Sequence, residues 1–282
     1  MVGVLGVSAS AILVRFSQAP SGVTAAYRLG WTVLLLLPVV LLRCRAELRR
    51  VTARDLVLCG ASGVLLALHF LTWFESLKRT SVASSTVLVS TEVIFTALGF
   101  ALFLHGKIPR LGVWAILLAF GGSALLALSG GGGAGELSGN LLALAAASAA
   151  AVYTLIGRIQ RGHLSTTVYT FLTYLACFLT LLLGTAAAGT PLTGYGGREW
   201  LIGLALAVLC TLLGHSLFSW CLKYLSPSYV SAAKLCEPVF SSLAAIPLFG
   251  EVPGPLQLAG GAAVLGAVLL YTWAEREKPP AG

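Results

Sequence analysis

The chain has 282 residues, of which 57% are hydrophobic and only 10% are charged, and its formal net charge is +8. Soluble domains carry roughly 25% charged residues, so this composition excludes an ordinary soluble protein. The basic residues are scattered at the ends of apolar runs rather than gathered in one stripe with aromatic residues, which excludes a typical nucleic-acid-binding surface.

Apolar runs follow one another along the whole chain. About 20 apolar residues in a helix cross a hydrocarbon core roughly 30 Å thick, and the runs are too long for barrel strands. Because backbone groups in lipid need internal partners, we expect helices. We therefore predict an all-α polytopic membrane protein with ten transmembrane helices. The runs cover approximately 1–17, 22–42, 56–77, 82–104, 111–129, 140–157, 165–188, 200–222, 227–249 and 254–274.

The same short pattern occurs twice, 145 positions apart. It reads Leu77-Lys78, Ser81 and Glu92 to Phe95 in the first copy, and Leu222-Lys223, Ser226 and Glu237 to Phe240 in the second. Such a repeat in an apolar chain is typical of transporters that are built from two copies of one unit. Since five helices form each copy and five is odd, the second copy enters the membrane from the opposite side. We therefore expect two inverted five-helix repeats.

A glycine-rich stretch separates the two copies. Gly130 to Gly133 form the longest flexible segment of the chain. We predict a first repeat over 1–130, a linker over 131–139, a second repeat over 140–274 and a cytoplasmic tail over 275–282.

The charges of the loops predict the orientation in the membrane. Five arginines lie between the second and third runs, and cytoplasmic loops hold the excess of Lys and Arg. This loop is therefore expected in the cytoplasm, which places both termini there in a cell (inner) membrane. The five are Arg43, Arg45, Arg49, Arg50 and Arg54.

Few ionisable residues lie inside the apolar runs. Each costs at least about 2.5 to 3.5 kcal/mol to insert, so each needs a partner or a wet cavity. Those away from the ends of the runs are Arg28, Glu92, Lys234 and Glu237. Lys234 and Glu237 are three positions apart on one expected helical face, so one interpretation is that they neutralise each other. The other places Glu92 and Glu237 at a central cavity, where a carboxylate exchanges protons or meets a cation.

Neighbouring polar and aromatic residues complete the candidate site. His69 and Trp73 lie on a polar stripe of the third run, and His215 lies on a similar stripe of the eighth. Either histidine could instead form a packed hydrogen bond between helices, and Trp73 could belong to an interfacial belt. Pro238 lacks a backbone donor, so we expect a local hinge that frees the carbonyl of Lys234.

Other kinds of chemistry find little support in the sequence. The six cysteines show no CxxC spacing, so we expect neither a disulfide nor a metal site. No phosphate-binding GxxxxGK[ST] loop is present, so any coupling energy must come from gradients, with no cofactor. Gly60 to Gly63 read G-x-S-G, which with His215 echoes an intramembrane serine protease, but helix packing by small residues explains the same motif.

The segments 226–240 and 248–251 resemble the signature of the EamA-type branch of the drug/metabolite transporter superfamily, and Glu92 to Phe95 resemble the same repeat in the first half. The resemblance implies ten helices in two inverted repeats, a central cavity and transport of small metabolites by alternating access. Arg28 matches an arginine that is frequent early in the second helix of this family. Val93 and Lys107 depart from the pattern, since the equivalent positions are Pro238 and Glu251.

We therefore expect a secondary transporter that exports small organic metabolites, amino acids or related compounds, and that is not an enzyme. We expect the bilayer and a small-molecule substrate as partners, protons as a potential coupling ion, and a monomer or homodimer. Arg28 would attract a substrate carboxylate, while Trp73 and Tyr27 would shape the pocket. The alternatives are a facilitator or a lipid-linked sugar flippase of the same fold, a protease that uses Ser62, and a scaffold or receptor.

Overall fold

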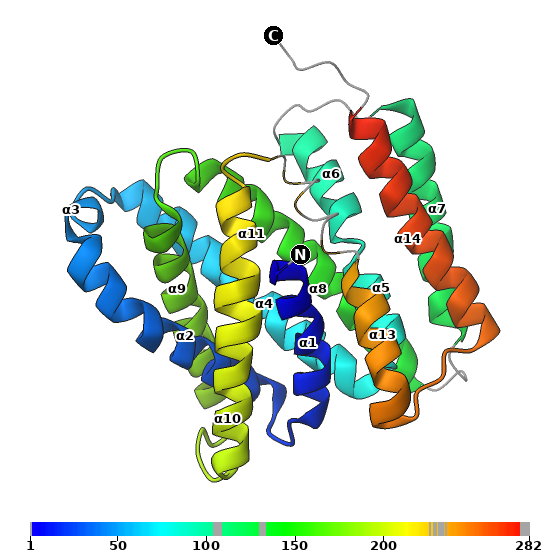
Figure 1. Cartoon of the computed structure of the whole chain (residues 1–282), viewed down its shortest axis with the longest axis horizontal. Coiled ribbons are helices and arrows are strands. Elements are labelled where there is room, and N and C mark those ends of the chain that lie inside the picture. The colour runs from blue at the N-terminus through cyan, green and yellow to red at the C-terminus, as the bar shows by residue number, and fades with distance from the viewer. Residues whose placement is uncertain are drawn as a thin grey trace.

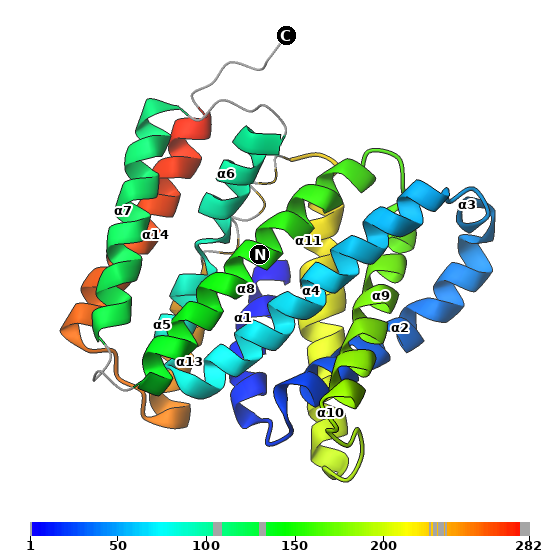
Figure 2. The same ribbon diagram turned by 180° about the vertical axis from the view of Figure 1, so that it is seen from behind.

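The computed structural model describes residues 2–103, 109–129, 134–225, 227, 230, 234 and 236–276, and these residues form helices and no strands. The helices gather into one bundle (Figures 1 and 2). Their bounds are α1 Val2–Phe16, α2 Ser21–Arg43, α3 Arg45–Leu48, α4 Ala53–Arg79, α5 Val82–Val89, α6 Glu92–Phe103, α7 Arg110–Ser129, α8 Ala134–Gln160, α9 Thr166–Ala187, α10 Gly197–Ala205, the π-helix η1 Leu206–His215, α11 Ser216–Cys221, α13 Cys236–Phe249 and α14 Pro255–Arg276.

Seven helical segments in the described part of the chain are long and apolar enough to cross a membrane. Shorter apolar helices cover Gly6–Phe16, Arg110–Leu126 and Glu237–Phe249. Each of the ten apolar runs in the sequence overlaps one of these segments. The prediction of an all-helical membrane protein is therefore confirmed.

Two of the apolar runs are not continuous α-helices. The run 82–104 is interrupted at Ser90 and Thr91, which separate α5 from α6. Their hydroxyls bond backbone carbonyls of the preceding turn, Ser90 to Thr86 at 2.9 Å and Thr91 to Leu88 at 2.6 Å, and such bonds compete with the helical ladder. The run 200–222 contains η1, a π-helical segment of 10 residues. The first interruption lies between Val89 and Glu92, and η1 ends at His215.

The two halves of the chain pack on each other in matching pairs. In the first half α4 packs on α8 of the second, and η1 of the second half packs on α1 of the first. The helices α2 and α9 contact each other, as do α7 and α14, which lie side by side at one edge of the bundle (Figures 1 and 2).

Small residues permit the closest of these contacts. A Cβ atom on Gly63 of α4 would lie only 2.6 Å from the carbonyl oxygen of Thr173 in α9. The hydroxyl of Ser62, beside it, lies 3.0 Å from that of Tyr169. Gly122 of α7 and Gly260 of α14 face each other, since a Cβ on either would lie 2.9 Å from the carbonyl oxygen of the other. Ser62 and Gly63 of the motif Gly60 to Gly63 therefore lie at a contact between helices, as its alternative interpretation predicts.

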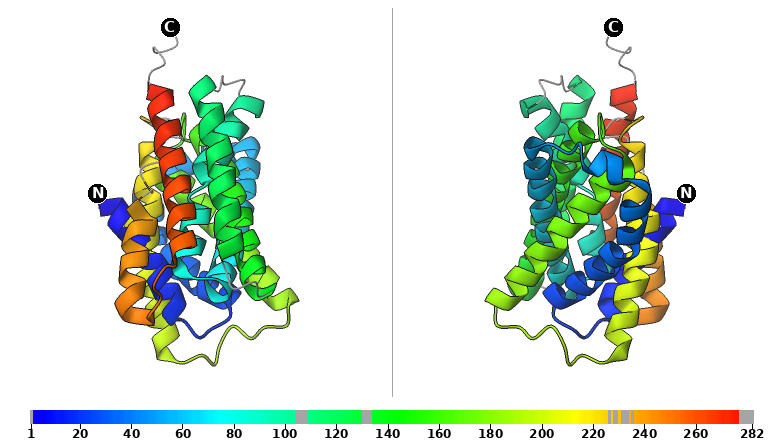
Figure 3. Two further views of the ribbon diagram at one scale, coloured as in Figure 1. Left: turned by 90° about the vertical axis from the view of Figure 1, so that its right-hand side faces the viewer. Right: turned by 90° about the vertical axis from the view of Figure 1, so that its left-hand side faces the viewer.

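The bundle has two ends (Figure 3). We call the end near α3 the α3 end and the opposite end, near α10, the α10 end. The helix α14 ends at the α3 end, and the α10 end carries the turn between α13 and α14. The helix α1 begins near mid-height (Figure 1). The helix α8 begins at Ala134, within the segment 131–139 that is predicted from the sequence to be a linker, and the division into two repeats stays a prediction.

Candidate functional site

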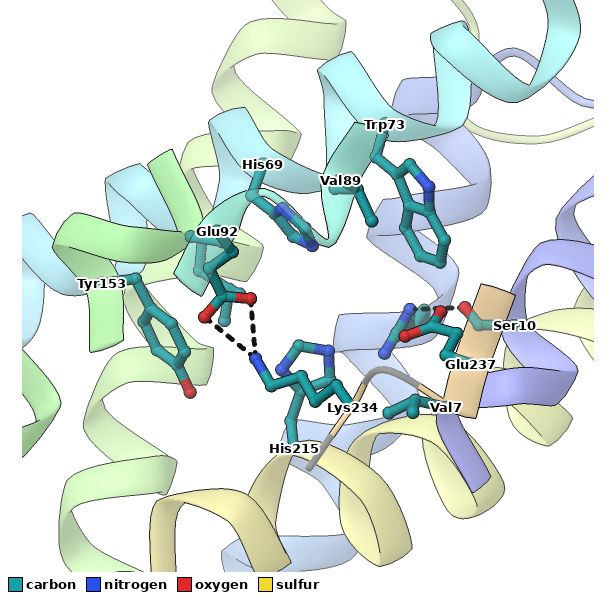
Figure 4. A pocket seen from close by; sticks show the side chains of 13 residues that line it. Val7, Ser10, His69, Trp73, Val89, Glu92, Tyr153, His215, Lys234 and Glu237 are labelled. Atoms are coloured by element: carbon teal, nitrogen blue, oxygen red, sulfur yellow. Dashed lines mark hydrogen bonds and ion pairs between the residues drawn. The ribbon is translucent and has the colours of Figure 1, made fainter. Parts of the chain in front are cut away.

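A small cavity lies at the centre of the bundle (Figure 4). It encloses about 30 Å³, which is room for about two water molecules. Seven of the eight side chains that the sequence suggests for substrate or coupling line it, and only Tyr27 does not. The cavity lining comprises Val7, Ser10, Arg28, Leu66, His69, Trp73, Val89, Glu92, Ala150, Tyr153, His215, Lys234 and Glu237.

Arg28 is fully buried in α2, at 0% exposure. Its Nε donates to the hydroxyl of Thr211 at 2.7 Å and its Nη1 donates to that of Ser10 at 3.2 Å. The guanidinium also lies 4.2 Å from the ring centroid of Phe70, within range of a cation–π interaction. Its Nη2 is buried and has no hydrogen-bond partner in the described part of the chain. One donor of a buried cation is therefore left over.

Lys234 pairs with Glu92 from the other half of the chain. Its Nζ lies 3.0 Å from Oε1 and 2.8 Å from Oε2 of Glu92, as the dashed lines in Figure 4 mark. The hydroxyl of Thr154 in α8 donates to the same carboxylate at 2.9 Å. The interpretation in which Lys234 and Glu237 neutralise each other on one helical face is therefore wrong. Lys234 precedes α13, so helical spacing does not apply to it.

Glu237 lies in the first turn of α13 and is 8% exposed. No hydrogen bond or ion pair joins its carboxylate to another residue of the described ranges. Its backbone N–H donates to the carbonyl of Lys234 at 2.8 Å, so the expectation that Pro238 frees this carbonyl is wrong. Pro238 falls in the first turn of α13, where a missing N–H disrupts no helical bond. Its role as a hinge remains a prediction.

Aromatic side chains form another part of the cavity wall. His69 and Trp73 of α4 stack with ring centroids 5.8 Å apart. His215, at the end of η1, lies edge-on to His69 and Tyr153 at 6.3 Å and 6.4 Å. The Nδ1 of His69 lies 3.0 Å from the carbonyl oxygen of Ala146 in α8. His69 thus makes the interhelical bond that the packing interpretation predicts, and it also lines the cavity.

Tyr27 points away from this cavity although it precedes Arg28. Its ring stacks on that of Trp200 at 4.0 Å, and its hydroxyl donates to the carbonyl of Leu192. It lines a separate, mainly apolar groove on the outside of α2, formed with residues of α9, the segment that follows it and α10. The expectation that Tyr27 shapes the central pocket is therefore not supported by its position.

Two residues of the site could not be identified from the sequence, namely Ser10 and Tyr153, which line the cavity. Thr211, on the same polar stripe as His215, holds Arg28 from within η1. The only available signal is polarity, because Ser10 and Tyr153 are polar residues within apolar runs. The π-helix has no compositional signal, although π-helical turns often occur at functional sites.

Polar contacts join the two halves at the α10 end of the bundle. Arg15, near the end of α1, forms an ion pair with Glu251 in the turn before α14. The Nη1 of Arg15 also donates to the carbonyl of Leu77 at 2.6 Å, and Glu251 accepts from the backbone N–H of Val82 at 2.7 Å. Lys107, the expected counterpart of Glu251, lies outside the described residues.

A second polar cluster joins the halves at the α3 end. The Nε2 of His163, between α8 and α9, lies 2.7 Å from Oδ1 of Asp55 in the first turn of α4. Gln160 donates to the same oxygen at 3.2 Å. Together with Arg15 and Glu251, this cluster holds the two halves together on both sides of the cavity.

The residues of the protease alternative are not arranged for catalysis. Ser62 bonds to Tyr169, and His215 contacts aromatic rings in the cavity. No contact in the described ranges joins Ser62 to His215.

Comparison with known proteins gives the family. A model of the EamA-like transporter family matches residues 1–128 and, separately, 137–273. The "Pseudopaline exporter CntI" of Pseudomonas aeruginosa is 24% identical over 73% of this chain and 72% of its own length. The "Probable terminal-alkyne amino-acid exporter" of Streptantibioticus cattleyicolor is 28% identical over 79% of this chain and 75% of its own. A protein of known crystal structure aligns with 98% of this chain over 96% of its own length. The TM-score is 0.69 and the sequence identity is 18%, which shows a shared fold.

Proposed function

The chain belongs to the EamA-like transporter family, and from this premise we propose that it is a secondary transporter that exports small organic metabolites, amino acids or related compounds, by alternating access. The observation that carries the proposal is the central cavity. It brings together two cations and two carboxylates from spans of both halves, at a depth where each charge is costly. Charges of this kind are retained where a pathway for a polar substrate needs them.

Alternating access requires two halves that move about a central site. The separate family matches to residues 1–128 and 137–273 support two repeats. The matching contacts, α4 on α8 and η1 on α1, support a twofold relation between these repeats. We therefore propose ten transmembrane helices in two inverted repeats, in the inner membrane, with the α3 end on the cytoplasmic side.

The size of the cavity fits one state of such a cycle. At about 30 Å³ it is too small for an amino acid, so a substrate enters only when the walls separate. The contacts of Arg15 with Glu251 and of His163 with Asp55 would then break in turn, one at each end. We therefore assign the state described here to the occluded step of the proposed cycle.

The names of the similar proteins support the substrate class. One is named as an exporter of pseudopaline and another as an exporter of a terminal-alkyne amino acid. We propose that this chain likewise exports an amino acid or a related compound.

Glu237 is the group that we assign to coupling. It lines the cavity with no hydrogen bond or ion pair to its carboxylate among the described residues, near Arg28, His69, Glu92, His215 and Lys234. A carboxylate in this position binds either a proton or a cationic group of the substrate, and exchange of one for the other couples export to proton entry.

Flux in proteoliposomes tests the proposal. Vesicles with purified protein are loaded with a panel of labelled amino acids, and efflux is measured with and without an inward proton gradient. We expect efflux of at least one compound, faster with the gradient in wild type and independent of it in Glu237→Gln. Glu75→Gln is the matched control, because Glu75 pairs with Arg79 on the surface of α4. Normal, pH-dependent flux in folded Glu237→Gln refutes the coupling role.

The same experiment distinguishes a proton-coupled exporter from a facilitator and from a lipid-linked sugar flippase. A facilitator gives efflux that the proton gradient does not change in wild type. A lipid-linked sugar flippase gives no amino-acid flux but moves a fluorescent lipid between leaflets. The small enclosed cavity gives no support to the flippase.

A further inference from the structure

We propose that the central cavity binds a zwitterion, with the substrate carboxylate on Arg28 and the substrate ammonium group on Glu237. This inference rests on the proposed function and assigns the atoms of the site that recognise its substrate. Its evidence is which charged groups of the cavity wall already have hydrogen-bond partners among the described residues and which do not.

The guanidinium of Arg28 has an unused donor. Thr211 and Ser10 fix Nε and Nη1, while Nη2 is buried without a partner in the described part of the chain. A buried donor without an acceptor is costly, particularly on a charged group. Because no described side chain accepts from Nη2, a ligand acceptor can form a hydrogen bond with Nη2 without displacing an existing partner. This bond then adds to the affinity of the ligand. A carboxylate gains most, because charge-assisted bonds to arginine are about twice as strong as neutral ones.

Glu237 is the unused anion of the same cavity. The other carboxylate, Glu92, already accepts both from Lys234 and from Thr154. Lys234 therefore forms its ion pair with Glu92 and not with Glu237, whose side chain is buried at the cavity wall. A ligand ammonium group would supply the hydrogen bonds and the charge that this carboxylate lacks.

The charges of the cavity therefore predict the charges of the ligand. The pair of Lys234 and Glu92 cancels, which leaves one cation, Arg28, and one carboxylate, Glu237. A compound with one charge only would leave the other group unmatched in a region of low dielectric. A zwitterion matches both. The apolar and aromatic lining, with Leu66, Trp73 and Val89, suits an uncharged side chain on that zwitterion.

Matched analogues test the assignment by binding alone. The probes are the zwitterionic amino acids that have uncharged side chains, each with its methyl ester, which lacks the carboxylate, and its N-acetyl derivative, which lacks the ammonium group. Their affinities are measured by calorimetry on purified protein in detergent. For wild type we expect at least one amino acid to bind about tenfold or more tightly than both of its derivatives.

Variants of Arg28 and of Glu237 should each lose the preference for one charged group of the ligand. Arg28→Gln is expected to bind the amino acid and its ester equally, while it still rejects the N-acetyl derivative. Glu237→Gln is expected to show the converse. If Arg28→Gln does not fold, Arg28→Lys replaces it and should reduce the preference over the ester at least threefold, because lysine cannot reproduce the geometry of Nη2. Glu75→Gln, away from the cavity, should match wild type.

The outcomes distinguish this inference from the proposed function. No zwitterion bound, equal affinity for all three forms, or unchanged discrimination in both folded variants refutes the zwitterion site. Export of an ester or a simple amine with no preference for the amino acid leaves the transporter intact and refutes only this inference. Selective binding without flux in proteoliposomes supports the site and refutes the transporter.

Discussion

The ammonium nitrogen of Lys234 lies 2.8 Å from a carboxylate oxygen of Glu92, and this ion pair joins the two halves of the chain across the central cavity. Glu92 opens α6 and Lys234 lies two positions before the start of α13, so the pair connects the beginnings of two helices from different halves of the chain. Both side chains are largely buried, with 9% and 17% exposure. The ion pair is therefore in a position to hold the cavity closed.

Removal of one member of this pair should destabilise the protein. An uncompensated buried charge costs about 3–5 kcal/mol, whereas replacement of both members by uncharged residues costs much less. We expect Lys234→Met and Glu92→Gln each to lower the free energy of unfolding by about 3 kcal/mol. The double variant should lose less than the sum of the two. Unfolding in mixed micelles measures all three, and strictly additive losses would show that the pair contributes nothing.

Adjacent glycines in α7 should respond oppositely to the same substitution. A Cβ on Gly122 would lie 2.9 Å from the carbonyl oxygen of Gly260 and 2.9 Å from the backbone nitrogen of Val264, whereas one on Gly121 would meet nothing within 4 Å. Gly122→Ala should therefore cost about 1–3 kcal/mol by overpacking. Gly121→Ala should be neutral or slightly stabilising, because alanine favours helices. Thermal unfolding of the two variants checks the contrast, and equal effects would contradict the close crossing of α7 and α14.

The sequence is sufficient to predict the helices and most of the cavity. Hydropathy and length identify the spans, and the cost of a buried charge singles out Arg28, Glu92, Lys234 and Glu237, all of which line the cavity. These inferences succeed because the transfer free energy of a side chain from water to lipid depends mainly on that residue and little on its neighbours.

Properties that depend on neighbouring helices could not be predicted. Tyr27 and Arg28 are adjacent, and only the positions of α9 and α10 decide which of them faces outward. The partner of Lys234 depends on the start of α13, which removes it from the helical face of Glu237. The π-helix η1 depends on a one-residue change in backbone register, for which the side chains give no pattern.

The position of Tyr27 predicts a residue that stabilises the protein but does not select the substrate. Tyr27→Phe removes the hydrogen bond to the carbonyl of Leu192, which should lower the free energy of unfolding by about 1 kcal/mol. The relative affinities for an amino acid, its ester and its N-acetyl derivative should stay as in wild type, in contrast to Arg28→Gln. A changed order of affinities in Tyr27→Phe would place this side chain in the substrate site after all.

The ion pair of Arg15 with Glu251 predicts a gate at the α10 end. Arg15 holds the carbonyl of Leu77, and Glu251 holds the first N–H of α5, so opening at this end requires both contacts to separate. In the double variant Arg15→Cys/Glu251→Cys, a bifunctional thiol reagent should tie α1 to the turn before α14. We expect flux in proteoliposomes to fall at least fivefold after cross-linking and to return when the reagent is cleaved by reduction.

A second ion pair provides the matched control for this gate. Glu75 and Arg79 lie one turn apart on the same helix, α4, so a cross-link in Glu75→Cys/Arg79→Cys restrains no motion between the halves. This variant should keep its flux after the same treatment. The same is expected of wild type, which has only its native cysteines, and of the variants that carry only one of the two introduced cysteines. Undiminished flux in a fully cross-linked Arg15→Cys/Glu251→Cys protein would mean that the α10 end does not open. Inhibition in the control pair would instead indicate that the reagent acts elsewhere, because a bridge within one helix cannot block the relative movement of two repeats.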